Sequence, residues 1–273
     1  NDPWFSKKLA SYAHFYVNDA FGTIHREHAS TAGIASHIPG VMGLLVEKEI
    51  QYFTQIFQNP KQPFNLILGG SKVSTKIGVI KSLMGTVSRI FIGGGMCFTF
   101  LKGLGYEIGK SLCEDEKIDL AMDILKLSKE KGIEIILPVD LVVANEITYN
   151  AHKKVVSIDS IPSNMMGVDI GPKTIQLFKE KIKGAKTVLW NGPMGVFEMS
   201  PFASGTFEVA HMIANLKDSI TLVGGGESVM AANMAGIKDK FTHVSTGGGA
   251  TLEFLEGKKL PGIVALLNNE ILK

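Results

Sequence analysis

The chain has 273 residues, long enough to bury a large core as one α/β unit or as two domains. Its 28 basic and 26 acidic residues nearly balance, which argues against a nucleic-acid-binding surface or a membrane-surface helix. The two cysteines, Cys97 and Cys113, form neither a disulfide framework nor a metal-binding spacing. No apolar run approaches the roughly 20 residues of a membrane helix. We therefore expect a cytoplasmic protein.

Apolar strands alternate along the chain with amphipathic helices, a pattern typical of a parallel sheet covered on both faces. Helices are predicted over 5–11, 41–58 and 115–131. The segment from about 146 to 171 is rich in turn residues around one short strand, 154–158, and we interpret it as an insertion. The remaining predicted strands are 15–18, 65–68, 89–92, 134–137, 187–190, 219–223 and 241–245.

One complete doubly wound unit is predicted, from Pro60 to about Leu255. The residues before Val41 contain too few elements for a domain of their own. The chain opens Asn1-Asp2-Pro3, without an initiator methionine and close to a predicted helix. We expect a fragment or a processed piece.

Three glycine triplets, 93–95, 224–226 and 247–249, each follow a predicted strand and precede a predicted helix. Such a turn directs backbone N–H groups and the positive end of a helix dipole at a bound anion, most often phosphate. On one parallel sheet, all three turns lie at the carboxyl edge, where open α/β sheets bind ligands. Close backbone packing explains a single triplet as well. The repetition favours a nucleotide site.

A fourth glycine turn, Gly69-Gly70, leads into Lys72 and Lys76, four residues apart. On a helix these side chains share one face, where two ammonium groups repel each other unless an anion lies between them. A phosphoryl group in transfer is such an anion. The alternative is a solvated pair of surface lysines. The position directly after a strand and glycine turn favours the functional interpretation.

Two further loops place polar side chains after strands. The turn that begins at Asn191 offers an amide to phosphate and, at Glu198, a carboxylate to ribose hydroxyls; a tight strand-to-helix turn is the alternative. Glu227 and Ser228 follow the second triplet at a helix start. Glu227 is either a negative charge that stabilises the positive end of the helix dipole or a ligand that holds Mg²⁺ on a nucleotide. Magnesium needs only one or two carboxylates from the protein.

Other motifs give weaker signals. Residues 105–111 are one residue short of a P-loop, and no triplet completes G-x-G-x-x-G, which weakens a nicotinamide-cofactor interpretation. The seven histidines show no metal-ligand spacing. Arg26 lies in the densest polar stretch. It could grip a phosphate or carboxylate of a substrate, or pair with Glu27 or Asp19, and the sequence leaves these alternatives open.

Several of these segments together closely resemble the phosphoglycerate kinase family. The resemblance runs from end to end of the chain and keeps the family's order, which makes it far more specific than one glycine fingerprint. The segments that carry it are 17–22 (VNDAFG), 69–76 (GGSKVSTK), 137–140 (LPVD), 169–172 (DIGP), 190–193 (WNGP), 245–250 (STGGGA) and 255–258 (LEGK).

The resemblance implies reversible transfer of the acyl phosphate of 1,3-bisphosphoglycerate to Mg-ADP, a glycolytic step that gives ATP and 3-phosphoglycerate. No covalent enzyme intermediate is needed, because positioning and charge neutralisation carry this chemistry. By motif, Gly70, Ser71, Gly94 and Gly95 would line the adenosine pocket, Glu198 would hold the ribose, and Asn191, Lys76 and Ser228 would touch phosphates. Lys76, with Lys72 and the amides of Gly225, Gly226, Gly248 and Gly249, would stabilise the moving phosphoryl group; Glu227 would hold Mg²⁺, and Arg26 would contact the glycerate substrate.

The family's two lobes give the expected domain organisation. Residues 1–40 are predicted to be a remnant of an amino-terminal substrate-binding lobe, 41–59 an interdomain helix, 60–255 the nucleotide-binding lobe, and 256–273 a segment that returns to the first lobe. Two features depart from the family pattern. Glu227 replaces an Asp, and the amino-terminal third, which carries most of the basic glycerate-binding patch, is absent. The isolated chain is therefore expected to bind nucleotide with little turnover.

A non-catalytic nucleotide-binding α/β module is the alternative function, because it would share every glycine loop. The expected partners are 1,3-bisphosphoglycerate or 3-phosphoglycerate and ADP or ATP, with no nucleic acid and no membrane. The full-length protein is expected to be a monomer.

Overall fold

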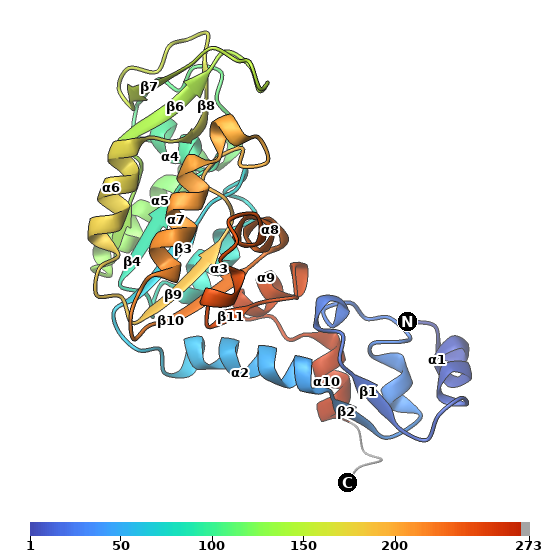
Figure 1. Ribbon diagram of the computed structural model, residues 1–273. Coiled ribbons are helices and arrows are strands. Elements are labelled where there is room, and N and C mark those ends of the chain that lie inside the picture. Colours follow the sequence, from blue (N-terminus) through green and yellow to red (C-terminus); the bar gives the residue numbers. More distant parts are fainter. Residues whose placement is uncertain (269–273) are drawn as a thin grey trace. The chain divides into compact units, whose positions relative to one another are not determined.

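The computed structural model describes residues 1–268, which divide into two compact units. One unit contains residues 1–59 and the segment that begins at Ser245; the other contains residues 60–244 (Figure 1). Within residues 1–268, no helix has both the length and the apolar composition needed to cross a bilayer.

The larger unit is built on a six-stranded sheet with the order β11-β10-β9-β3-β4-β5, in which every pair of neighbours is parallel. The chain runs outward from β3 through β4 to β5 and then starts again on the other side of β3 at β9. The strands are β3 Phe64–Leu68, β4 Arg89–Ile92, β5 Glu134–Ile136, β9 Thr187–Asn191, β10 Ile220–Gly224 and β11 His243–Val244. This is the doubly wound α/β sheet that the alternating pattern predicts, and the prediction is confirmed.

Helices cover both faces of this sheet, with α6 and α7 in front of it in Figure 1 and α4 and α5 behind. The front face buries Trp190, Phe91 and Phe178, with the two phenylalanine rings edge to face at 5.1 Å. These strands read as continuous apolar runs because both of their faces are covered. The helices of the unit are α3 Ile77–Leu83, α4 Cys97–Gly103, α5 Ile118–Glu130, α6 Pro172–Lys181, α7 Ser204–Ala214 and α8 Gly226–Met234, with 3₁₀ helices at Asp115–Lys117, Ser200–Phe202 and Lys238–Lys240.

A second, three-stranded sheet belongs to the same unit. Its strands are β6 Asp140–Ala144, β7 Lys153–Ser157 and β8 Met166–Ile170, and β6 pairs antiparallel with both of the others. The sequence analysis expected a single strand at 154–158 inside an insertion. That expectation is incomplete, because β7 makes its ladder hydrogen bonds with β6, and β6 pairs on its other side with β8.

Among its described residues, the smaller unit contains a two-stranded parallel sheet and four α-helices. Its elements are α1 Pro3–Ala10, β1 Tyr16–Asn18, β2 Gly40–Met42, α2 Leu44–Gln58, α9 Gly249–Leu255 and α10 Pro261–Leu267, with 3₁₀ helices at Phe21–Thr23 and Gly33–Ser36. The aromatic rings of Phe21, Phe53 and Phe254 form its core, with Phe53 at 6.3 Å from Phe21 and 5.9 Å from Phe254.

The boundary between the units differs from the predicted one. The sequence analysis extended the nucleotide-binding lobe to residue 255, whereas the larger unit ends at Val244. Residues 245–255 join the smaller unit because the buried Glu49 carboxylate of α2 accepts hydrogen bonds from the amide (2.7 Å) and hydroxyl (2.9 Å) of Thr246. The last five residues of the predicted returning segment, 269–273, lie outside the described residues.

Helix α2 receives its N-terminal cap from a residue outside the helix. Gly43 precedes α2 and offers no side chain, and Asp19 Oδ1 instead accepts from the amides of Leu45 (2.7 Å) and Val46 (3.2 Å). The carboxylate thereby satisfies two first-turn amides and lies at the positive end of the helix dipole.

We expect Asp19→Ala to lower the free energy of unfolding by about 1 kcal/mol, because it removes this cap. Urea denaturation followed by circular dichroism measures the change. The exposed Asp239→Ala is the matched control and should shift the midpoint by much less. Equal midpoints for the two variants would contradict the capping role.

Candidate nucleotide and phosphate site

Four strands of the large sheet end level with one another, which brings their following loops together. Leu68 pairs with both Ile92 and Asn191, and Asn191 pairs with Gly224, so β4, β3, β9 and β10 end side by side. The chain changes direction across the sheet between β3 and β9, and the carboxyl ends of the strands at such a switch point are where open α/β sheets bind ligands. Three of the predicted glycine loops therefore meet at one edge of the larger unit.

Backbone hydrogen bonds tie these loops together. The amide of Gly70 donates to Pro193 O (2.8 Å), that of Gly94 to Met194 O (3.1 Å), and that of Met96 to Gly70 O (3.0 Å). The sequence analysis expected the glycine triplets to direct unpaired backbone amides at an anion. For Gly94 this is wrong, because its N–H group already donates to the carbonyl oxygen of Met194 in a neighbouring loop, and the amide of Gly70 is paired in the same way.

The glycines are needed here for space. Gly94 has φ +63°, and a Cβ at this position would lie 2.6 Å from the Gly70 nitrogen and 2.7 Å from Pro193 O. No L side chain fits such a contact without moving the backbone. Gly70, Gly94 and Gly95 therefore present backbone, without side chains, to the pocket described next.

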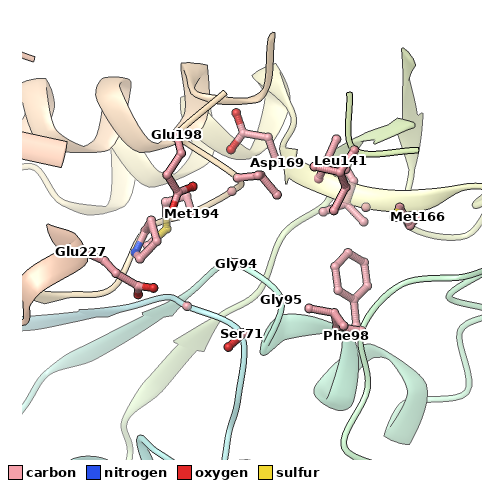
Figure 2. A pocket seen from close by; sticks show the side chains of 18 of the residues that line it. Ser71, Gly94, Gly95, Phe98, Leu141, Met166, Asp169, Met194, Glu198 and Glu227 are labelled. Carbon is pink, nitrogen blue, oxygen red and sulfur yellow. The ribbon is translucent and has the colours of Figure 1, made fainter. Parts of the chain in front are cut away.

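A pocket of about 300 Å³ opens above these loops (Figure 2). Six of the predicted nucleotide-binding residues line it: Gly70, Ser71, Gly94, Gly95, Glu198 and Glu227. The other walls are mainly apolar and come from α4, β6, β8 and the loop after β9; Phe98, Leu112, Leu141, Met166, Val168 and Met194 are among their residues. An apolar slot with a few polar groups at one end suits a planar base attached to a charged group.

Two charged residues of the pocket were not among the predicted site residues, Lys110 and Asp169. Lys110 lies in the segment that fails the P-loop spacing, so no motif marked it. Asp169 lies on β8, whose strand character was missed. Burial raises the pKa of Asp169 to about 7, with hydrogen bonds from the Gly205 and Ile170 amides and the charge of Lys153 acting in the opposite direction.

A buried polar cluster lies directly beneath the charged end of the pocket. Lys76 Nζ donates to Asn191 Oδ1, and Asn191 Nδ2 donates to Gly224 O (2.8 Å). Ser228 Oγ accepts from the amide of Gly192 (2.6 Å). The structure therefore places Lys76, Asn191 and Ser228 together, as the sequence analysis expected. All three are buried and none lines the pocket, so phosphate contacts by these residues stay a prediction.

Lys76 is the cation of this cluster. Burial lowers the pKa of its ammonium group, and the negative charge of Glu227 acts in the opposite direction. Glu227 lies in the first turn of α8, which begins at Gly226 after Gly225 adopts φ +89°. The first amides of a helix have no intrahelical acceptor, so this loop keeps N–H groups available for an anion.

The two lysines do not share a helix face. α3 begins only at Ile77, and residues 73–76 form a turn, so the helical i, i+4 relation expected for Lys72 and Lys76 is wrong. Lys72 is exposed, whereas Lys76 is 8% exposed. The charge of Lys72 helps to lower the pKa of Glu114, whose carboxylate holds Ser74 through its amide (2.9 Å) and hydroxyl (2.5 Å).

The remaining predicted site residues belong to the smaller unit. Gly248 has φ +51° and precedes α9, which begins at Gly249. Arg26 is exposed in the turn after the first 3₁₀ helix, and no ion pair joins it to Asp19 or Glu27. Asp19 instead caps α2, and Glu27 accepts from Asn1 (3.3 Å). The roles of Gly248, Gly249 and Arg26 stay predictions.

The carboxylates present fit a magnesium ion that a nucleotide brings with it. Among residues 1–268, no three His, Cys, Asp or Glu side chains gather into a metal-binding group. Mg²⁺ needs only one or two carboxylates when phosphate oxygens and water complete its shell. Glu227 is exposed at the charged end of the pocket and meets that requirement.

Comparison with known proteins agrees with this geometry. A family model described as phosphoglycerate kinase matches residues 1–258. A phosphoglycerate kinase from Dictyoglomus turgidum is 58% identical over 266 residues, which cover 97% of this chain and 67% of that protein.

Solved structures show the same relationship. The phosphoglycerate kinase structure from Coxiella burnetii matches with a TM-score of 0.91 at 40% identity, over 97% of this chain and 68% of the other. The structure from Pyrococcus horikoshii matches with a TM-score of 0.85 at 29% identity, over 98% of this chain and 69% of the other. The sheet order, the glycine loops and these matches lead to one conclusion: the chain belongs to the phosphoglycerate kinase family.

Proposed function

We propose that the edge formed by the β3, β4, β9 and β10 loops binds Mg-ADP or Mg-ATP and that phosphoryl transfer with 1,3-bisphosphoglycerate or 3-phosphoglycerate takes place at its charged end. The observation that carries this proposal is the position of Lys76, which lies beside Asn191 and within the field of Glu227 under a pocket lined by Gly70, Gly94 and Gly95. A cation at one end of an apolar slot provides separate places for phosphate and base.

In this proposal each part of the site has a distinct task. The apolar walls and the backbone of Gly94 and Gly95 bind the base, and Glu198, which also lines the pocket, accepts hydrogen bonds from the ribose hydroxyls. The free amides at the start of α8, together with Lys76, neutralise charge on the phosphates. Glu227 would hold the magnesium ion of the nucleotide, which supplies electrostatic stabilisation of the phosphate oxygens. Roles for Lys72, Gly248, Gly249 and Arg26 in phosphoryl transfer and substrate binding are proposed from the family motifs alone.

Protein groups supply positioning and charge in this chemistry, and no side chain needs to become a nucleophile. Lys76 is desolvated before substrate arrives, because it is buried and bonded to Asn191. Its attraction for a phosphoryl oxygen is therefore stronger than that of a solvated lysine. The proposal places the protein in the cytoplasm, where glycolysis runs, as a monomer when full length.

Formation of ATP from 1,3-bisphosphoglycerate and Mg-ADP by the purified chain tests the proposal directly. Titration with Mg-ADP by calorimetry, run on the same sample, separates binding from turnover. A non-catalytic nucleotide-binding module would bind Mg-ADP and form no ATP. Absence of Mg-ADP binding would contradict the proposed site itself.

We expect Lys76→Met to lower the rate of ATP formation by about 10² to 10³-fold, comparable to the loss of one donor that stabilises transition-state charge. The variant should unfold at a slightly lower temperature, because the buried Asn191 Oδ1 loses its donor, a cost that removal of the buried charge only partly offsets. Lys81→Met, on the exposed side of α3, is the matched control. Activity of Lys76→Met near that of the control would refute the role of Lys76.

We expect Glu227→Gln to weaken binding of Mg-ADP by about tenfold, because one carboxylate–cation attraction is lost. Binding of ADP in the presence of a chelator should be unchanged or tighter, since a negative charge beside the phosphates has been removed. Calorimetry with and without Mg²⁺ gives both values. An equal loss under the two conditions would show that Glu227 does not act through the metal.

A further inference from the structure

The Asp169 carboxylate occupies a junction between β8, α7 and the loop after β9. Its Oδ1 accepts from the amide of Ile170 (2.9 Å) and its Oδ2 accepts from the amide of Gly205 (2.6 Å), in the first turn of α7. The residue is 3% exposed, although it belongs to the pocket lining. Figure 2 shows it on the wall opposite Gly95, with its carboxylate directed away from Gly94 and Gly95.

Hydrogen bonds connect this junction to the nucleotide side of the pocket. Thr206, the next residue in α7, accepts from the amide of Met194 (2.9 Å) through Oγ1. The amide of Val196 donates to Val168 O of β8 (2.9 Å). Segment 193–198 is therefore held on one side by α7 and on the other by β8, and Asp169 joins those two elements. This segment provides five lining residues of the pocket, including Glu198.

The carboxylate is also closely enclosed. A side chain at Gly195 or at Gly205 would overlap its oxygens, so both positions admit only glycine beside Asp169. The enclosing groups of α7 and β8 are backbone amides. Lys153 of β7 is the charged side chain whose field reaches Asp169, and its Nζ donates to Pro201 O (2.7 Å).

Ionised Asp169 is unfavourable for stability. Its pKa in the folded protein is about 7, and that of an unfolded aspartate is about 3.9. The folded protein therefore holds an extra proton between these values, and the free energy of unfolding falls as the pH rises through that window. A buried group that costs stability at a binding pocket points to a role in binding.

We propose that Asp169 is a positioning residue whose ionised carboxylate fixes segment 193–198 in the form that binds adenine nucleotide. The inference rests on the proposed function. Each carboxylate oxygen accepts from one backbone amide, and both of these hydrogen bonds are charge-assisted while Asp169 is ionised. Protonation removes the charge and weakens both bonds, which loosens the hold of α7 and β8 on the junction and lowers nucleotide affinity.

The test compares Asp169→Asn with the unmodified chain, with Mg-ADP as the probe. At pH 8.5 we expect Asp169→Asn to bind Mg-ADP about tenfold more weakly, because a charged acceptor of two amides is lost. At pH 6.0, where most of Asp169 is protonated, the affinities should agree within about twofold. Comparing the two proteins at each pH cancels the titration of the nucleotide itself. At pH 8.5 the variant should also unfold at an equal or higher temperature.

Asp140→Asn is the matched control. Asp140 is equally buried and also caps a helix from a strand, since it accepts from the amides of Lys173 (3.0 Å) and Thr174 (2.7 Å) of α6. It does not belong to the pocket lining. We expect this variant to lower the unfolding temperature and to leave Mg-ADP binding unchanged.

The outcomes separate the two proposals. If the unmodified chain binds no Mg-ADP at either pH, the proposed function fails, and the role of Asp169 fails with it. If it binds Mg-ADP, but Asp169→Asn binds equally well at pH 8.5 or shows a deficit that is the same at both pH values, the positioning role alone is refuted. Equal losses for the Asp169 and Asp140 variants would show that only general stability was changed.

Discussion

The level ends of β3, β4, β9 and β10 are the constraint on which the rest of the site depends. Because these strands are parallel and in register, their loops leave the sheet at one edge and lie close together. Glycine is needed at position 94, since a Cβ there would clash with the backbone of two other loops. The same crowding uses the amides of Gly70 and Gly94 in hydrogen bonds between loops. Backbone close packing and ligand binding are thus two consequences of one arrangement.

The sheet and most of its edge could be predicted from the sequence, because the parallel strands are apolar on both faces and a glycine lies at or directly after the ends of β3, β4, β9 and β10. β4 begins and ends at the predicted residues, Arg89 and Ile92. The three-stranded sheet could not be predicted in the same way. β7 is largely exposed, and the segment between β6 and β8 is rich in turn residues, so the local pattern resembled a loop. Only the antiparallel pairing, a long-range feature, shows that β6 lies between β7 and β8.

Some side chains of the site could likewise be predicted from the sequence and others could not. Asn191 is the last residue of β9, and Lys76 and Ser228 lie in the segments that follow β3 and β10, so their places near the carboxyl ends of the strands predicted that they would lie near one another. Asp169 lies in one of the family segments, 169–172, but no local pattern marked its carboxylate as part of the site, since it accepts from the amide of a residue 36 positions later in the chain. The prediction that Lys72 and Lys76 share a helix face was wrong because it used only their spacing in the chain. The sequence contains the spacing of the two lysines, but the turn at residues 73–76 decides that only Lys76 is buried.

The charged groups on the two sides of the pocket in the larger unit differ in sign and in burial. On the wall formed by α8 and the β3 loop, a buried cation lies near an exposed carboxylate, and the pKa of Lys76 is lowered by burial and partly restored by Glu227. On the wall formed by β8, the carboxylate of Asp169 is buried and bonded only to amides. Burial disfavours the charged form of both groups, so ionisation of either group costs stability. For Lys76, a phosphate oxygen would offset that cost by direct attraction. For Asp169, the amides of Ile170 and Gly205 offset part of that cost from within the protein, without any ligand atom.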